Sequence, residues 1–183
     1  GVRMTQAWPA DPGAESLVLV GPVMEQSLAP AALAALGLGG APQVAVDGGI
    51  RFAHKPFLWT GDGDSGKPPQ NIPVIRKNTQ DETDLRFCLN GIRGWRWREL
   101  HLFGFVGGRR DHELANFGEI HAEMKRRRHF QRGVFYGPSH RPLAVFHPAG
   151  EHVFAHRGLF SMLAFDAASV TLSVDCRFPV EDM

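Results

Sequence analysis

The sequence predicts an α/β fold: a Rossmann-like parallel sheet with flanking helices, followed by a small antiparallel β-sandwich lobe. Two observations lead to this prediction. Between residues 15 and 130, short apolar runs that end at Gly or Asp alternate with stretches of helical periodicity. After residue 131, short β-like runs are separated by Gly, Pro and His, without a helix-length segment between them. We therefore expect a flexible arm over 1–14, an α/β domain over 15–130 and a β lobe over 131–183.

Each expected element has a local reason. Strands are expected where buried-type apolar runs end at a glycine or aspartate or at a change of pattern, at 16–21, 43–46, 57–60, 72–75 and 100–105. A helix is expected over 31–36, which is rich in Ala and Leu. A second is expected over 81–92, where residues 85, 88, 89 and 92 form an apolar face, and a third over 111–125, where Leu114, Phe117, Ile120 and Met124 share one side. The expected strands of the lobe are 134–136, 143–146, 152–154, 159–162 and 170–174.

Composition limits the classes of partner. The 183 residues carry 20 basic and 19 acidic side chains, a net charge of +1, which gives no field that would gather nucleic acid or membrane lipid. The basic run Lys125–Arg128 follows a predicted helix, where cations offset the helix dipole, so we interpret it as a solvated helix end. No apolar stretch approaches the ~20 residues of a membrane span, and residues 1–14 lack the apolar core of a signal peptide. The two isolated cysteines, Cys88 and Cys176, are typical of reduced packing residues in a cytosolic protein.

The segment Gly61–Lys67 matches two familiar loop motifs only in part. The segment Gly61–Gly66 matches G-x-G-x-x-G by letter, but the prolines that follow exclude the helix whose N-terminus would face a pyrophosphate. Gly61–Lys67 also matches the first seven positions of the P-loop pattern. The eighth position is Pro68, which has neither the hydroxyl for Mg²⁺ nor an N–H for phosphate.

Polar residues gather instead at the ends of successive predicted strands and the starts of helices. Four clusters are present: Asp47-Gly48-Gly49; Asp62, Asp64 and Ser65; Gln80 to Asp84; and Gly107 to His112. Ligands of parallel sheets bind at the carboxyl ends of the strands. Aspartate and glycine are also ordinary turn residues, and Asp81, Thr83 and Asp111 suit helix N-caps. Four such clusters in succession nevertheless favour a site for a metal ion and a phosphate.

The residue types fit that chemistry. Mg²⁺ prefers carboxylate and water oxygens, and the Asp62-x-Asp64 spacing can place two carboxylates on one side of a turn. Amides at the helix start near Thr83 can accept a phosphate, and Arg109 offers a planar fork of donors for phosphoryl oxygens.

In this order, the four clusters resemble the motifs of the thiamine pyrophosphokinase family: D-G-[AG], G-D-x-D-S, [KQ]-D-x-T-D and G-G-R-x-D-H. Asn116 fits the L-x-N that often follows the last motif. The resemblance covers about residues 44–120. It implies transfer of the β,γ-pyrophosphoryl group of ATP to the hydroxyl of thiamine, giving thiamine diphosphate and AMP. It further implies a cytoplasmic homodimer that needs Mg²⁺ and binds ATP and thiamine.

Carried over residue by residue, the resemblance implies the following roles. Asp62, Asp64 and Asp84 would hold Mg²⁺. Asp47, Gly48, Ser65, Gln80, Thr83, His112 and Asn116 would line the nucleotide and phosphate path. Arg109 would stabilise charge on the transferred group, and Asp111 would orient the site. Either Asp111 or Asp47 could accept the proton of the alcohol.

The resemblance weakens in the expected β lobe. Ser161 lies in a stretch similar to the family's G-x-x-[SG]-[LI]-[LI] strand, and Phe178 stands at an aromatic position of the next element. The family's following strand, which carries an S-N pair that contacts thiamine, has no counterpart here, so we expect a shortened acceptor lobe. Two alternatives stay open on this ground: a pyrophosphokinase with a different alcohol acceptor, and a non-catalytic protein that binds nucleotide or thiamine.

Overall fold

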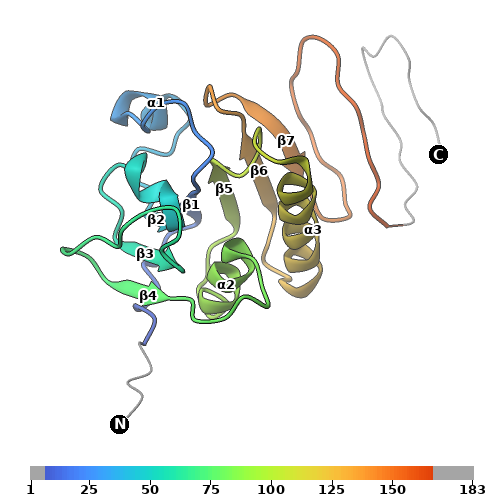
Figure 1. Ribbon diagram of the computed structural model, residues 1–183. Helices are drawn as coiled ribbons and strands as arrows, with labels where there is room; N and C mark the ends of the chain where they lie inside the picture. Colours follow the sequence, from blue (N-terminus) through green and yellow to red (C-terminus); the bar gives the residue numbers. More distant parts are fainter. Residues whose placement is uncertain (1–6, 167–183) are drawn as a thin grey trace. The chain divides into compact units, whose positions relative to one another are not determined.

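The computed structural model describes residues 7–166 and shows a mixed α/β fold built on one seven-stranded sheet (Figure 1). The strands are β1 (Ser16–Val20), β2 (Gln43–Val46), β3 (Leu58–Gly61), β4 (Val74–Arg76), β5 (Glu99–Phe103), β6 (Arg132–Tyr136) and β7 (Pro142–Phe146). The helices are α1 (Pro30–Ala35), α2 (Asp84–Gly91) and α3 (Arg110–Arg126), with a 3-10 helix, η1 (Asp47–Arg51), directly after β2.

The sheet order is β4-β3-β2-β1-β5-β6-β7, and every neighbouring pair is parallel except β6 and β7. The chain runs outward from β1 to β4 on one side of the sheet and then returns through α2 to β5 on the other side of β1. This reversal makes the gap outside the carboxyl ends of β1 and β5 the topological switch point, the place where open parallel sheets bind ligands.

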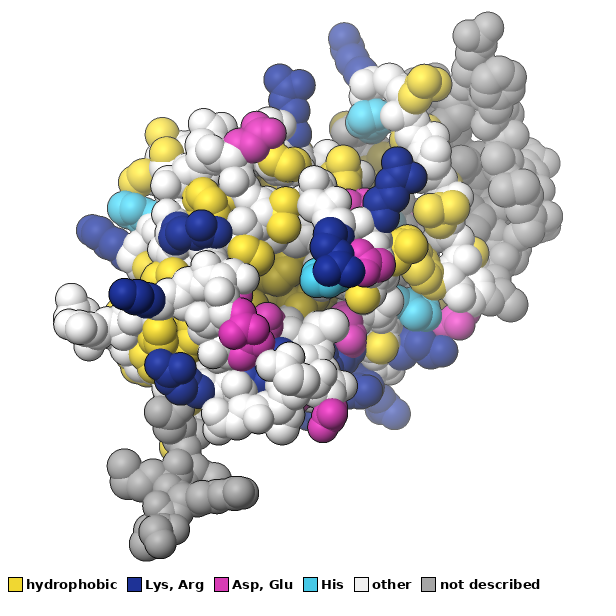
Figure 2. Space-filling model, in the orientation of Figure 1, with side chains coloured by type: hydrophobic (Ala, Val, Ile, Leu, Met, Phe, Trp, Pro, Cys, Tyr) yellow, Lys and Arg dark blue, Asp and Glu magenta, His cyan; other side chains and the backbone are white. Residues whose placement is uncertain are grey.

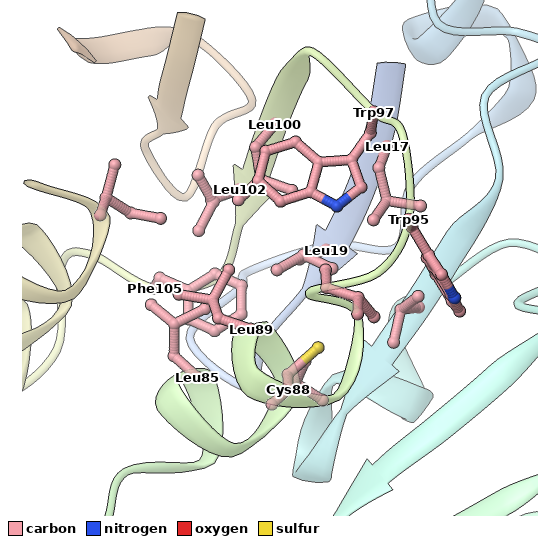
Figure 3. Packing of buried hydrophobic residues seen from close by; sticks show 14 of the residues in the cluster. Leu17, Leu19, Leu85, Cys88, Leu89, Trp95, Trp97, Leu100, Leu102 and Phe105 are labelled. Atoms are coloured by element: carbon pink, nitrogen blue, oxygen red, sulfur yellow. The ribbon is translucent and has the colours of Figure 1, made fainter. Parts of the chain in front are cut away.

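The core follows from strand alternation. Successive side chains of a strand point to opposite faces, and in β1 Leu17 and Leu19 join one buried cluster while Val18 and Val20 join another. The first cluster packs under α2 and α3, and the second packs with Leu33 of α1. Figure 3 shows Leu85, Cys88 and Leu89 of α2 within the first cluster, beside Trp95 and Trp97 from the segment that leads into β5. Burial raises the pKa of the Cys88 thiol, as expected of a packing cysteine; Cys176 lies outside the described residues.

Helix α3 differs from the sequence prediction on its buried face. Ile120 and Glu123 are fully buried, whereas Leu114, predicted to face the core, is 70% exposed. Glu123 is neutralised by the Arg86 guanidinium of α2, with 3.1 Å between the Glu123 Oε2 and Arg86 Nη1 atoms. A buried charge pair between two helices therefore replaces part of the expected apolar contact.

The predicted boundaries of the β lobe and of the N-terminal arm also differ from the structure. The runs at 134–136 and 143–146, predicted to begin a separate lobe, belong to β6 and β7 of the main sheet, because β6 pairs in parallel with β5. Residues 7–14 have no regular secondary structure but are not loose: Trp95 Nε1 donates to the Pro9 carbonyl at 3.2 Å, and the Arg96 amide donates to Asp11 Oδ2 at 2.8 Å.

Residues 151–183 separate from residues 1–150 as a second unit. In its described part, 151–166, the segments 152–154 and 159–162 are not strands, contrary to the prediction, and their apolar side chains are exposed. The predicted strand at 170–174 lies outside the described residues. Within residues 7–166, no helix combines the length and apolar character needed to cross a bilayer.

Candidate functional site

The polar clusters follow strands whose carboxyl ends meet at one edge of the sheet. Asp47 comes directly after β2, Asp62 after β3 and Gly107–Asp111 after β5, and these strands are all parallel to β1. The fold thereby brings residues far apart in sequence to the switch-point edge.

Asp47 is the residue around which the loop after β3 is built. It is 4% exposed and has a left-handed backbone (φ 46°), an uncommon conformation for a residue other than glycine. Its carboxylate accepts the Gly63 and Ser65 amides, both at 3.2 Å, and its carbonyl accepts Trp59 Nε1 at 2.9 Å. Gly61 is required beside it, because a Cβ there would lie 2.9 Å from the Asp47 Cα. Asp47 therefore fixes the conformation of the Gly61–Ser65 loop.

Three carboxylates converge at this point. Asp47, Asp62 and Asp84 each offer an oxygen, and these atoms lie within 4.8 Å of one another. Burial raises the pKa of Asp84; the nearby ammonium of Lys77 opposes that shift, and the negative charges of Asp62 and Asp47 add to it. Hard oxygen donors at this spacing suit a cation such as Mg²⁺, so the residues present fit the metal that the sequence motifs imply.

Lys77 is a site residue that the sequence analysis missed. Its Nζ lies 2.9 Å from Asp84 Oδ1 and 3.8 Å from Asp62 Oδ2, and it donates to the Glu82 carbonyl at 2.9 Å. The side chain is only 4% exposed. Strand periodicity could have identified it, because Lys77 lies two residues after the buried Ile75 and so shares its face.

Other predicted site residues lie around this group but outside it. Asp64 is exposed and is not one of the three converging carboxylates; its amide donates to Asp62 Oδ1 at 2.9 Å. Ser65 and Gln80 are exposed. Thr83 caps α2, since its Oγ1 accepts the Arg86 amide at 3.0 Å, so the helix begins at Asp84 rather than at the predicted residue 81.

The turn after β5 presents Arg109 and Asp111 as an exposed pair. Arg109 Nε donates to Asp111 Oδ1 at 3.1 Å, and Nη2 donates to Oδ2 at 2.5 Å. The hydrogen bond with Asp111 raises the pKa of Arg109, and the same bond lowers the pKa of Asp111. Asn116 supports the turn by donating to the Phe105 carbonyl at 2.9 Å, and His112 is exposed beside it. The planar fork of Arg109 is thus formed and accessible, with a carboxylate as its present partner.

The loop after β1 lies between the two halves of the site. A Cβ on Gly48 would lie 3.0 Å from Pro22 Cβ, and a Cβ on Gly108 would lie 3.1 Å from Val23 Cγ2. Pro22 and Val23 therefore separate the carboxylate half from the Arg109 half. On the face shown in Figure 2, acidic and basic side chains lie near one another with hydrophobic side chains between them.

The predicted site residues of the C-terminal part fall within residues 151–183, the second unit. Ser161 is exposed in the strand-free segment 151–166, and Phe178 lies outside the described residues. Their roles stay predictions.

These features define an α/β protein of the doubly wound kind with a polar, carboxylate-rich site at the carboxyl edge of its sheet. Residues 41–131, about half of the 183-residue chain, match the sequence model of the family described as "Thiamin pyrophosphokinase, catalytic domain". Through this segment the chain belongs to the thiamine pyrophosphokinase family. No match is found among curated proteins.

Solved structures of thiamine pyrophosphokinases resemble the fold. The Bacillus subtilis protein is 19% identical over 66% of this chain and 59% of its own, with a TM-score of 0.50. The Candida albicans protein is 14% identical over 66% of this chain and 57% of its own, with a TM-score of 0.49. At such identities the likeness to the bacterial protein shows the fold alone, and the chain spans less than two thirds of that protein's length.

Proposed function

We propose that this protein transfers the pyrophosphoryl group of ATP to the hydroxyl of thiamine in a Mg²⁺-dependent reaction that yields thiamine diphosphate and AMP. The observation that carries the proposal is the convergence of Asp47, Asp62 and Asp84 within 4.8 Å, inside the segment that matches the family's catalytic domain. A cytoplasmic location and a homodimeric state are further parts of this proposal.

Asp62 and Asp84 would hold the metal. Asp47 would complete the group while it fixes the Gly61–Ser65 loop, which carries Asp62. When bound, Mg²⁺ would supply neutralisation of charge on the phosphate oxygens of ATP. Asp64, Ser65, Gln80 and Thr83 would face the phosphates from the rim of the site. This division is supported by exposure, since Asp47 is buried and Asp64 is exposed.

Arg109 would exchange its Asp111 partner for oxygens of the transferred group, because a guanidinium binds phosphate with the same fork that binds carboxylate. Asp111 would then be free to accept the proton of the alcohol. Asp47 is less suited to that step, since both of its carboxylate oxygens already accept amides of the Gly61–Ser65 loop.

The C-terminal part of the chain, with Ser161 and Phe178, would contribute to binding of the alcohol acceptor, thiamine. A different alcohol acceptor, or binding without turnover, would leave the carboxylate group unchanged, so only an assay separates these outcomes.

The test is incubation with ATP, Mg²⁺ and thiamine, followed by chromatography for AMP and thiamine diphosphate. Asp62→Asn and Asp84→Asn should each lower the rate by about two orders of magnitude or more. Asp81→Asn is the matched control, because Asp81 is exposed and outside the carboxylate group. Absence of AMP with every alcohol tested would refute the activity, while AMP formation with another alcohol alone would refute thiamine as the acceptor.

A further inference from the structure

A second concave site lies at the opposite edge of the sheet from the carboxylates. It is a pocket of about 480 Å³ lined by Arg93, Gly94, Trp95, Arg96, Arg126, Arg127, Arg128 and His129. The first four residues immediately precede β5, and the last four lie between α3 and β6. Both segments are therefore at the amino ends of parallel strands, whereas the candidate active site is at the carboxyl ends.

Arg127 holds the two segments together. Its Nη1 donates to the Arg93 carbonyl at 2.8 Å, and its Nη2 donates to the Trp95 carbonyl at 2.6 Å. The guanidinium also lies 3.8 Å from the centre of the Trp97 ring. Burial lowers the pKa of Arg127, because its charge is partly removed from water. The pocket is thus preformed, and Arg127 is a structural member of its wall.

The positive charge of the pocket exceeds the negative charge of the groups around it. Five arginines line it. Two acidic groups of the described residues lie near it: Asp11, which accepts a hydrogen bond from the Arg96 amide, and Glu123, which shares its Arg86 partner with Glu119 and so leaves about one negative charge near Arg127. The C-termini of α2 and α3 add about half a negative charge each, which leaves an excess of about two positive charges. A solvated helix end, as predicted for the basic run from sequence, explains Arg126 but not the arginines that the other segment contributes.

The excess charge is confined to the pocket. The next basic side chains at this edge, Arg98 and Arg132, are paired with Glu15 at 3.8 Å and Glu99 at 3.5 Å. The confinement favours a compact anion over an extended polymer such as nucleic acid. The volume is within the range of small-ligand sites, and Arg127 in the wall of the pocket stacks on the Trp97 ring.

We propose that this pocket binds a small compound with two or more linked phosphate groups, held by the guanidinium groups of Arg93, Arg96, Arg126 and Arg128. Guanidinium forks bind phosphate oxygens in pairs, and two or more linked phosphates carry enough negative charge to offset the excess. The site is separate from the carboxylate group and does not depend on the proposed reaction.

The test is calorimetric titration of the whole protein with inorganic tripolyphosphate in EDTA, which prevents metal-dependent binding at the carboxylates. The Arg96→Ala/Arg128→Ala variant should bind about tenfold more weakly or worse. Arg132→Ala is the matched control, because Arg132 lies at the same edge but outside the pocket. It should bind as the wild type does, and so should Asp62→Asn.

Three results would overturn the proposal: no binding of tripolyphosphate by the wild type, equal binding by the double variant and the wild type, or binding of a single-stranded oligonucleotide in place of tripolyphosphate. Circular dichroism checks that the double variant is folded. If it is not, Arg96→Gln provides the second variant, since the hydrogen bond that the residue 96 backbone amide donates to Asp11 does not depend on the side chain.

Discussion

Replacing Lys77 by methionine keeps most of the length of the side chain and removes the positive charge among the three carboxylates. The ion pair with Asp84 at 2.9 Å corresponds to an attraction of about 6 kcal/mol at an effective dielectric constant of about 20. Water reaches part of this pair, since the Asp84 side chain is 29% exposed. We therefore expect the free energy of unfolding to fall by about 2 kcal/mol, and the melting temperature by about 4–8 °C.

The same substitution should strengthen the response to Mg²⁺. Without Lys77, the three carboxylates repel one another more strongly, and a divalent cation relieves more repulsion than in the wild type. A tenfold tighter Kd would add about 1.4 kcal/mol of stabilisation at a high Mg²⁺ concentration. The measurement is the melting temperature with and without Mg²⁺. Lys55→Met is the control, because Lys55 is exposed and outside the carboxylate group.

Two results would refute this reasoning about Lys77. An unchanged melting temperature in the absence of Mg²⁺ would show that the ion pairs contribute nothing to stability. An equal or smaller Mg²⁺ response in Lys77→Met would show that Lys77 does not stand in for part of the charge of a bound cation.

Three further substitutions test other parts of the structure. Arg86→Met should destabilise the protein by about 3–5 kcal/mol in urea denaturation, because it leaves the buried Glu123 charge unpaired, and adding Glu123→Leu should recover much of the loss. Gly104→Ala should lower the free energy of unfolding by about 3 kcal/mol or more, since φ is +85° and a Cβ would lie 2.3 Å from the Gly21 carbonyl oxygen. Gly118→Ala is its control: this glycine has open space around it in α3, so the substitution should be neutral or stabilising. Burial lowers the pKa of His101, so the unfolded chain binds more protons below about pH 6.5, and the free energy of unfolding should fall as the pH decreases from there. His101→Gln should flatten that decrease between pH 7.5 and 5.5, and an unchanged slope would contradict it.

Periodicity predicted β1, β2, β3 and β5 of the parallel sheet because these strands are buried on both faces. Such strands are continuous apolar runs, and β2 was predicted with the boundaries that the structure has, Gln43–Val46. A helix boundary differs from its prediction where a capping residue determines where the helix starts. The helix α2 begins three residues later than predicted, because Thr83 rather than a residue before Asp81 accepts the amide that starts the helix.

The assignment of β6 and β7 to a second lobe was wrong for a physical reason. Short runs such as 134–136 carry no information on which sheet they join, and the connection through α3 made a parallel pairing with β5 available. Leu114 was placed in the core by its spacing alone. Spacing cannot show that the neighbouring helix contributes Arg86, whose charge draws Glu123 into the buried face of α3.

The sequence predicted which strand ends carry the polar clusters of the site, but not how their side chains are arranged. Motif order indicated Asp62 and Asp84, whereas nothing in the sequence showed that the Asp47 carboxylate would hold the loop amides of Gly63 and Ser65. Lys77 was missed because lysine is rarely buried. Its burial depends on carboxylates from two other segments, which only the fold brings together.

The short loop after β1 has a consequence for how the two halves of the site can vary. Pro22 and Val23 lie against Gly48 on one side and Gly108 on the other, with no room for a side chain at either glycine without displacement. A larger residue at one glycine would push the loop toward the other. The spacing between the carboxylates and Arg109 is therefore held by a common spacer, and a change in that spacing would require coordinated substitutions in three loops rather than one.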